Sequence, residues 1–326
     1  MIQGTLEHSL VVVFGGAGYI GSVLVRKLLE RNYRVRIFDN FLFGNYGVRE
    51  LSSPNLEIID GDICDTVAVS IALNGADAVI FLAAVVGRRV KDIPLRNVRE
   101  VNLLASSAAL DAAIEHGASR FLFASTDSVY GVQSGVMYET GTPEPISLYS
   151  RLKLRMEERI LRAEQPGFHP TALRIATCHG YSPRMRFDLV ANGLIRDAVC
   201  LKEVTIEGGE QCRTLIHVDD VADAFIAVLE AHENLVSGEL FNVGVTGSSV
   251  QLKQLVGMVK NLVPETKVNF LEGEPDLVDY FLSCKKIEKV LDFTPKWTIE
   301  AGLEQVRDLL LEGYFTDPYS AQYANT

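Results

Sequence analysis

A glycine-rich stretch near the start of the chain constrains the fold most strongly. In VVVFGGAGYIGS, an apolar run that reads as a strand ends at Gly15, and a helical pattern opens at Gly18 and Gly21. Glycine at a strand-to-helix turn permits a tight turn, close approach of the backbone to a phosphate, and close packing of the helix on the strand. Asp39 stands 18 residues after Gly21, at the end of the next expected strand. This combination predicts a dinucleotide-binding unit.

Apolar runs alternate with helix-length segments through the first half of the chain. The expected strands are 9–15, 33–39, 56–60, 77–83, 120–125 and 170–175, and the expected helices include 20–31, 97–116 and 148–163. Alternation of this kind favours parallel pairing through right-handed crossovers, so we expect an α/β fold with a doubly wound, Rossmann-type parallel sheet. The pattern loosens after residue 175. We therefore expect a nucleotide-binding domain over 1–175 and a smaller C-terminal substrate-binding lobe over 176–326.

The composition excludes several classes of protein. The chain has 326 residues, 48% of them hydrophobic, and a formal net charge of −11, which disfavours nucleic acid or an anionic membrane as a partner. Its five cysteines show no paired or zinc-like spacing, which predicts free thiols and no metal site. No apolar run approaches the ~20 residues of a membrane span, and the N-terminus lacks a signal-peptide pattern. We therefore expect a cytoplasmic protein.

A polar cluster stands directly after the fifth expected strand. In FASTDSVYG, the residues Thr126, Asp127 and Ser128 stand between an apolar run and a Tyr-Gly turn. Turn chemistry explains such a cluster, because these side chains bond to their own backbone where strands end; an active site is the alternative. Farther on, Tyr149 and Lys153 stand four apart in a helical segment, which places both on one face. An ammonium near a phenol favours the phenolate, so this pair predicts a base of lowered pKa.

This succession of motifs resembles the extended short-chain dehydrogenase/reductase family, in particular its nucleotide-sugar epimerases and dehydratases. The resemblance continues through CRTLIHVDDVADAF at 212–225, FNVG at 241–244 and DFTPKWTIEAGLEQ at 292–305. It implies an NAD-dependent enzyme in which Tyr149, as phenolate, removes a proton from a sugar hydroxyl, usually at C4, while the carbon gives hydride to NAD⁺. It further implies that Thr126 orients that oxygen and that Lys153 also holds the nicotinamide ribose.

Several residues are expected to hold the cofactor. Asp39 can accept both hydroxyls of the adenosine ribose and would repel a 2′-phosphate, and no arginine comes directly after it, so NAD is favoured over NADP. Asp62 and Ile63 come after the third strand, where an adenine edge could be held, although Asp62 could equally cap a helix. The other residues expected to contact NAD are Gly15, Gly18, Tyr19, Ile20, Gly21, Asn40, Leu82, Ala83, Ala84, Asn102, Tyr149 and Lys153.

The polar cluster also bears on the fate of the sugar after hydride transfer. In the family's 4,6-dehydratases the three positions read Thr-Asp-Glu, with the Asp as acid and the Glu as base at C5; here they are Thr126, Asp127 and Ser128. A serine hydroxyl without a partner base does not remove a carbon-bound proton near neutral pH. We therefore expect a C4 epimerase that acts through a transient 4-keto sugar. The alternatives are a 4-dehydrogenase or 4-ketoreductase, then a dehydratase, then an NAD-binding protein without catalysis.

Four residues are expected to bind the substrate, a nucleotide-diphosphate sugar. Arg184 and Arg186 alternate with apolar residues in SPRMRFDL, and Arg213 stands at the position that contacts the diphosphate in the family. Guanidinium groups fit phosphate oxygens, although each arginine could also solvate a loop or pair with acids. Asn192 resembles the asparagine of the family's substrate lobe.

Two further expectations come from the resemblance. The hexose epimerases carry an arginine before a GD…Y element near the C-terminus, but EGEPDLVDY at 272–280 has none, so Arg184 or Arg186 would complete the clamp. The nucleotide base and the sugar stay open. Helices 97–116 and 148–163 resemble those that form a four-helix dimer interface in the family, which implies a homodimer, although stripes such as Val101 and Leu104 could equally be core.

Overall fold

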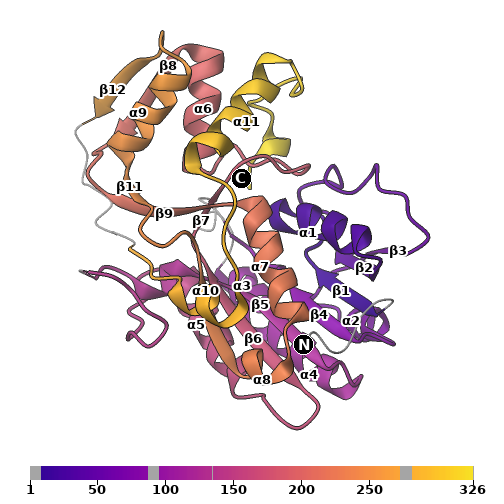
Figure 1. Ribbon diagram of the computed structural model, residues 1–326. Coiled ribbons are helices and arrows are strands. Elements are labelled where there is room, and N and C mark those ends of the chain that lie inside the picture. Colours follow the sequence, from indigo (N-terminus) through magenta and orange to yellow (C-terminus); the bar gives the residue numbers. More distant parts are fainter. Residues whose placement is uncertain (1–8, 87–94, 134, 272–280, 326) are drawn as a thin grey trace.

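A parallel β-sheet organises the larger part of the molecule (Figure 1). The computed structural model describes residues 9–86, 95–133, 135–271 and 281–325. Within them the strands of this sheet run in the order β10-β6-β5-β4-β1-β2-β3, and each neighbouring pair is parallel. The strands are β1 (Leu10–Phe14), β2 (Arg34–Asp39), β3 (Leu56–Asp60), β4 (Ala78–Phe81), β5 (Arg120–Thr126), β6 (His169–Ile175) and β10 (Glu239–Val243). The expected doubly wound, Rossmann-type sheet is confirmed.

Helices bury both faces of the sheet, because alternate residues of a strand point to opposite sides. In β1, Val11 and Val13 join one hydrophobic core, whereas Val12 and Phe14 join the other. Residues of α1 and α7 belong to the first core, and residues of α2, α4 and α5 to the second. These helices are α1 (Tyr19–Glu30), α2 (Thr66–Leu73), α4 (Ser106–Glu115), α5 (Leu148–Leu161) and α7 (Val218–Glu230).

The helix expected over 97–116 is interrupted. It consists of α3 (Leu95–Arg99), a π-helical segment η2 (Glu100–Ala105) and α4. A π-turn widens a helix locally and often marks a functional position. Here it carries Asn102, whose side chain is buried and faces the loop after β4. The sequence pattern did not predict this irregularity.

A smaller part of the molecule begins after the carboxyl end of β6. Its sheets have the orders β11-β9-β7 and β12-β8. Its remaining elements pack around them or return to the large sheet (Figure 1). The elements after β6 that have not yet been given are β7 (Thr177–His179), α6 (Val190–Leu201), β8 (Glu203–Glu207), β9 (Cys212–His217), α8 (Glu233–Val236), β11 (Ser249–Gln251), α9 (Leu252–Leu262), β12 (Lys267–Leu271), α10 (Lys285–Leu291), α11 (Ile299–Leu311) and η4 (Ala321–Tyr323). The short turn η3 (Asp127–Tyr130) belongs to the larger part, where it comes directly after β5.

The chain crosses between the two parts more than once. Strand β10 and helix α7, both beyond residue 175, belong to the large sheet and its core. The division at residue 175 therefore does not describe which residues form each part of the structure. The assignment of NAD binding to 1–175 and of substrate binding to 176–326 stays a prediction. No helix in the described part of the chain combines the length and apolarity that crossing a membrane requires.

Candidate active site

The turn between β1 and α1 leaves room only for glycine at two positions. Gly15 has a φ of +80°, and a Cβ atom there would lie 2.7 Å from the backbone nitrogen of Ala83. A Cβ atom on Gly21 would overlap the carbonyl oxygen of Gly15. Gly18 caps α1 without a side chain that could bond the first N–H groups of the helix. This cradle fits a pyrophosphate, because its oxygens accept N–H donors at a helix N-terminus.

The carboxylate of Asp39 lies at the end of β2, beside the glycine turn. It accepts hydrogen bonds from the backbone N–H groups of Ala17 and Phe41, each at 3.0 Å. Burial raises the pKa of this carboxyl, and the two N–H donors and the charge of Arg184 oppose the rise. Each carboxylate oxygen has more than one lone pair, so Asp39 can still accept ribose hydroxyls.

Three other residues expected at the cofactor lie in turns after strands. Asp62 accepts a hydrogen bond from the backbone N–H of Cys64 at 2.9 Å, and Ile63 is buried in the hydrophobic core. The helix cap of α2 is Asp65, which accepts from two backbone N–H groups, so the capping alternative for Asp62 does not hold. Asn40 likewise accepts from the backbone N–H two residues on, at 3.1 Å.

The loop after β4 lies against the glycine turn. Leu82, Ala83 and Ala84 begin this loop, and the Ala83 backbone forms the wall that excludes a side chain at the first glycine. Asn102 fixes the loop from the π-helical segment: its amide oxygen accepts from the Val85 N–H at 2.7 Å, and its amide nitrogen donates to the Val85 carbonyl at 2.8 Å. Asn102 therefore acts on the cofactor site through the backbone it holds.

Tyr19 and Ile20 open α1, and Tyr19 links it to the smaller part of the molecule. The Tyr19 hydroxyl donates to the Gly180 carbonyl at 2.7 Å and accepts from the Asn192 amide at 3.2 Å. Asn192 also accepts from the Gly180 N–H at 2.9 Å and donates to the Arg186 carbonyl at 3.0 Å. In this structure Asn192, expected to contact substrate, holds the backbone around the site.

Thr126, Tyr149 and Lys153 lie where β5 ends and α5 begins. Thr126 is the last residue of β5 and caps the short turn η3. The Lys153 ammonium donates to the Ala124 carbonyl at 2.7 Å and lies 4.5 Å from the centre of the Phe123 ring. It is 6.0 Å from the centre of the Tyr149 ring. The side chains of the expected catalytic set thus converge on the carboxyl end of a central strand.

The protonation of this pair differs from the expectation. Burial raises the pKa of Tyr149, which the sequence predicted to be lowered by Lys153; the charge of Arg186 lowers it. The Lys153 ammonium is directed to the Ala124 carbonyl, and burial lowers its own pKa to about 7. In this structure the phenol is therefore the favoured form of Tyr149.

Asp127 is buried beside the Thr126 hydroxyl. It is 4% exposed, and its Oδ1 accepts from the Thr126 hydroxyl at 3.3 Å and the Ser128 hydroxyl at 3.5 Å. Its Oδ2 has no hydrogen-bond partner among the described residues. Burial raises the pKa of this carboxyl to about 7, against the opposing charge of Arg213. Asp127 can therefore carry a proton near neutral pH and offer it to a ligand.

The three arginines expected at the substrate have different partners. Arg184 donates to two backbone carbonyls, those of Met185 at 3.2 Å and Ala324 at 3.1 Å. Arg186 forms an ion pair with Asp188 at 2.5 Å, and its charge reaches the phenol of Tyr149. Arg213 lies on β9 and donates to the carbonyl of the preceding residue at 2.8 Å. Arg186 thus acts electrostatically on Tyr149 and Arg213 acts on Asp127, whereas Arg184 is engaged elsewhere.

Cys178 is a neighbour of the site that the sequence did not indicate. Burial raises the pKa of its thiol to about 12, the charge of Arg186 lowers it, and the charge of Asp127 raises it. Its charge in turn acts on Tyr149. The sequence shows only that Cys178 comes shortly after the expected strand 170–175. In the structure it lies on β7, the strand that comes after β6. The segment 272–280, where the hexose epimerases carry an arginine and this chain has none, lies outside the described residues.

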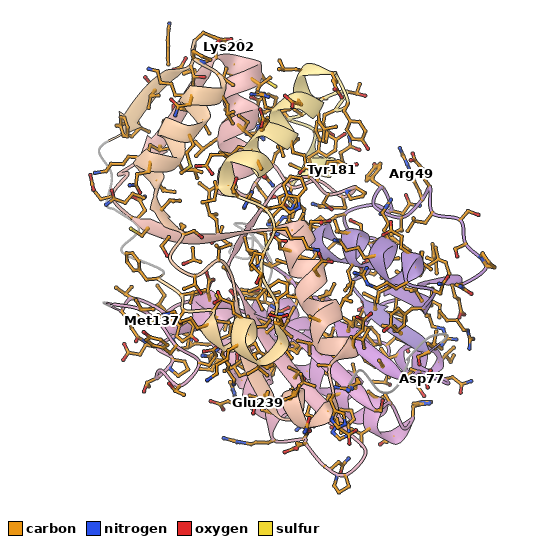
Figure 2. The ribbon with its side chains drawn as sticks, in the orientation of Figure 1. Arg49, Asp77, Met137, Tyr181, Lys202 and Glu239 are labelled. Atoms are coloured by element: carbon orange, nitrogen blue, oxygen red, sulfur yellow. The ribbon has the colours of Figure 1, made fainter. Side chains whose placement is uncertain are left out.

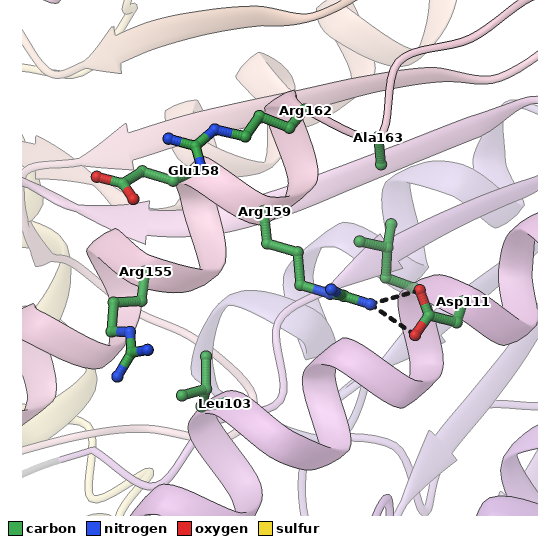
Figure 3. Close-up of a pocket in the computed structure, with 8 residues that line it drawn as sticks. Leu103, Asp111, Arg155, Glu158, Arg159, Arg162 and Ala163 are labelled. Atoms are coloured by element: carbon green, nitrogen blue, oxygen red, sulfur yellow. Dashed lines mark hydrogen bonds and ion pairs between the residues drawn. The ribbon is translucent and has the colours of Figure 1, made fainter.

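A separate depression of about 500 Å³ lies on the outer side of α4 and α5 (Figure 3). Charged side chains line much of it, and Arg159 donates to both carboxylate oxygens of Asp111, at 2.6 and 2.7 Å. Arg155, Glu158 and Arg162 surround this ion pair. Tyr149 lies at the other end of α5, so this depression is distinct from the candidate active site.

The parallel sheet, the glycine cradle and the Tyr-Lys pair after β5 define a dinucleotide-dependent enzyme of the short-chain dehydrogenase/reductase type. The model of the NAD dependent epimerase/dehydratase family matches residues 11–244. The chain belongs to this family, and its cofactor is NAD.

Known proteins resemble the chain over most of its length. A UDP-glucose 4-epimerase of Corynebacterium glutamicum is 30% identical over 311 residues, which cover 88% of this chain and 91% of that protein. The crystal structure of a UDP-glucose 4-epimerase of Thermotoga maritima with UDP-glucose has a TM-score of 0.83 at 28% identity and covers 94% of this chain and 100% of its own. The protein MoeE5 in complex with UDP-glucuronic acid and NAD has a TM-score of 0.82 at 29% identity and covers 93% and 99%.

Proposed function

We propose that the protein is an NAD-dependent nucleotide-sugar 4-epimerase. The observation that carries the proposal is the side-chain set around Thr126: the adjacent acid Asp127 is buried, and the next position is Ser128 in place of a second carboxylate. An epimerase needs hydride transfer and a base at the C4 hydroxyl but no base at C5. The relatives that act on UDP-glucose at C4 support the same reaction.

Each catalytic residue has a distinct part in this reaction. When bound, NAD would supply the chemistry of hydride acceptance from C4 and of hydride return, from its reduced form, to the opposite face of the ketone. Tyr149 removes the proton from the C4 hydroxyl and later restores it, and Thr126 donates a hydrogen bond that orients the same oxygen. Lys153 places a cation beside the phenol once it turns from the Ala124 carbonyl, which lies 2.7 Å away in this structure. That rotation would lower the pKa of the phenol, which burial alone raises.

The glycine cradle, Asp39 and the loop fixed by Asn102 would hold the cofactor. The cradle has the backbone N–H groups and the open space that a pyrophosphate requires. Asp39 has the position and charge that favour an adenosine ribose without a 2′-phosphate. Tyr149 and Lys153 complete the site at the nicotinamide end.

The substrate proposed is a uridine diphosphate sugar. Arg213 and Arg186 supply positive charge near the catalytic side chains in a chain whose net charge is −11. Guanidinium groups recognise the oxygens of a diphosphate. The relatives and solved structures that bind or act on UDP-sugars favour uridine as the base. Asn192 would act by holding the backbone around Gly180.

We also propose a cytoplasmic homodimer. All five cysteines are free thiols, as in a reducing compartment. The segment η2, which leads into α4, carries Leu104, which is 51% exposed, and the charged depression of Figure 3 lies on the outer side of α4 and α5. A two-fold axis would pair these faces and bury both features. The assignment of 1–175 to NAD and of 176–326 to the sugar nucleotide also stays a proposal.

The test is incubation of the purified protein with UDP-glucose, UDP-glucuronic acid, UDP-N-acetylglucosamine and the GDP-, CDP- and dTDP-linked sugars in deuterated water. We expect conversion to the C4 epimer with no net change in NAD and no deuterium in the carbon skeleton. Deuterium at C5 together with loss of water would show that the reaction is a dehydration and not an epimerisation. Stoichiometric consumption of added NAD, with a ketone as product, would favour the dehydrogenase.

A further inference from the structure

The segment 180–187, which leads into the smaller part of the molecule, is bonded to the start of the cofactor helix α1. The Ser182 hydroxyl donates to the Tyr19 carbonyl at 2.7 Å and lies 2.9 Å from the Ser22 hydroxyl. The Tyr19 hydroxyl in turn donates to the Gly180 carbonyl. These bonds fix the beginning of the segment against the larger part of the molecule.

Arg184, two residues on, is buried at the same junction. It is 2% exposed, and its guanidinium carbon lies 5.0 Å from the centre of the Phe43 ring. Phe43 belongs to the loop after β2, the loop that directly follows Asp39. A Cβ atom on Gly47, in the same loop, would lie 2.9 Å from the Arg184 Cβ. Arg184 therefore packs against the loop that carries the acid expected at the adenosine ribose.

The same guanidinium of Arg184 also holds the C-terminal tail. Its Nη2 donates to the Ala324 carbonyl at 3.1 Å. The tail is fixed nearby by the Phe187 N–H, which donates to the Tyr323 carbonyl at 2.7 Å, and by the Phe315 ring, whose centre lies 5.0 Å from that of Phe187. Figure 1 shows the C-terminus between the two parts of the molecule, near α1. The charge of Arg49, labelled in Figure 2 on the loop after β2, also acts on Tyr323.

We infer that Arg184 is a positioning residue for the adenosine end of the NAD site, and that it makes retention of NAD depend on the C-terminal tail. The residue joins three elements: the loop with Asp39 and Phe43, the segment 180–187, and the tail at Ala324. Its cation also stabilises the charged form of Asp39. The inference rests on the cofactor site of the proposed function and adds a way in which the enzyme keeps its cofactor.

The position of Arg184 disfavours the role first expected for it, contact with the substrate diphosphate. Both terminal nitrogens donate to backbone carbonyls, and the face of the guanidinium lies against an aromatic ring. A cation held over a ring and bonded to carbonyls contributes through desolvated contacts that a Lys reproduces only in part. Arg186 and Arg213 stay the proposed contacts of the diphosphate.

The experiment loads the full-length protein with NAD and measures the rate at which NAD is released into cofactor-free buffer. The variants are Arg184→Met, Arg184→Lys and a truncation after Asp317, which removes the tail contacts. Arg120→Met is the control, because Arg120 is also a buried arginine that donates to a backbone carbonyl, that of Ala231 at 2.7 Å, but it lies at the first residue of β5 and, among the described residues, has no contact with the tail. Each variant is also melted in the absence of NAD to record its own stability.

We expect Arg184→Met and the truncation to release NAD about tenfold faster, which corresponds to about 1.4 kcal/mol. Arg184→Lys should fall between the wild type and Arg184→Met, and Arg120→Met should release NAD at the wild-type rate. Wild-type release from a folded Arg184→Met protein would overturn the inference, as would equal acceleration by Arg120→Met. A protein that holds NAD but epimerises no sugar nucleotide would contradict the proposed reaction and leave this test intact.

Discussion

Glu157 of α5 and Arg174 of β6 form a buried ion pair beneath the candidate active site. The two side chains are each 3% exposed, and the guanidinium donates to both carboxylate oxygens, at 2.6 and 3.0 Å. Ser125, one residue before Thr126, donates to the same carboxylate at 2.7 Å. The guanidinium carbon lies 4.6 Å from the centre of the Tyr130 ring. The pair therefore ties together the helix that carries Tyr149 and the strands beneath it.

Replacing Glu157 by Ala should destabilise the fold. A buried ion pair that loses one partner leaves an uncompensated charge, which costs about 3–5 kcal/mol. Glu158 is the matched control, because it is the next residue of the same helix and is exposed. Urea unfolding of the two variants measures the difference. If Glu157→Ala and Glu158→Ala lowered the free energy of unfolding equally, the pair would have no special role in stability.

Replacing Tyr149 by Phe should abolish epimerisation with little effect on folding. Loss of a general base lowers the rate about a hundredfold or more. Tyr33→Phe is the control, since Tyr33 is also buried, precedes β2 and has its hydroxyl 3.4 Å from Glu230 on α7. The measurement is kcat for the best sugar nucleotide, together with the amount of NAD bound. A Tyr149→Phe enzyme with wild-type kcat would show that the base lies elsewhere.

Asp127 should make stability depend on pH in an unusual direction. Burial raises its pKa from 3.8 to about 7, so between these values the native protein binds a proton that the unfolded chain has lost. Its contribution to stability therefore decreases as the pH rises from about 4 to about 7, by about 4 kcal/mol at most. The amide of Asp127→Asn does not titrate in this range, so this decrease in stability with rising pH should be absent from the variant.

The measurement for Asp127→Asn is the melting temperature of the variant and the wild type from pH 4.5 to pH 8. We expect the variant to gain on the wild type as the pH rises and the gain to level off above pH 7. The epimerase rate of the variant should also lose any inflection that the wild type shows near neutral pH. A difference in melting temperature that is the same at every pH would contradict the assignment of a raised pKa.

The same substitution should have opposite effects at two helical glycines. A Cβ atom on Gly302 of α11 would overlap the ring of His179, whose Nδ1 is buried without a partner among the described residues. Gly257 of α9 is exposed and has no atom within 4 Å of such a carbon. Gly302→Ala should therefore cost about 1–3 kcal/mol, and Gly257→Ala should stabilise the protein by up to about 1 kcal/mol.

Thermal or urea unfolding of the two glycine variants checks this contrast. If Gly302→Ala were as stable as Gly257→Ala, α11 would be free to shift away from the paired rings of His179 and His217, whose centres lie 5.3 Å apart. Retention of the native far-UV spectrum by both variants would show that the comparison is between folded proteins.

The first half of the fold was predictable because its signals are local. The run before Gly15, the spacing of Gly18 and Gly21, and Asp39 at the end of the next strand occupy one continuous stretch, and the structure has β1, α1 and β2 there. The interrupted helix at 100–105 and the return of the chain to the large sheet as β10 were not predictable in this way, because they depend on contacts with distant segments.

The residues of the candidate site show the same difference between local and distant signals. The order Thr126, Tyr149, Lys153 and the serine at position 128 can be read from the sequence, and they suffice for the family and the kind of chemistry. The surroundings of Arg184 and Asn192 cannot, since their partners Ala324 and Tyr19 lie 140 and 173 residues away. The sequence predicted that these two side chains contact the substrate, whereas in the tertiary structure they form hydrogen bonds within the protein.

The sequence by itself determined the strand-to-helix cradle, the acid after β2, and the presence of a hydroxyl, a phenol and an ammonium in one order, because covalent spacing and helical period set these relations. Only the tertiary structure decided the protonation of the site. Burial raises the pKa of Asp127 and Tyr149 and lowers that of Lys153. Desolvation and the charges of Arg186 and Arg213 arise from elements brought together by folding, so no local pattern encodes them.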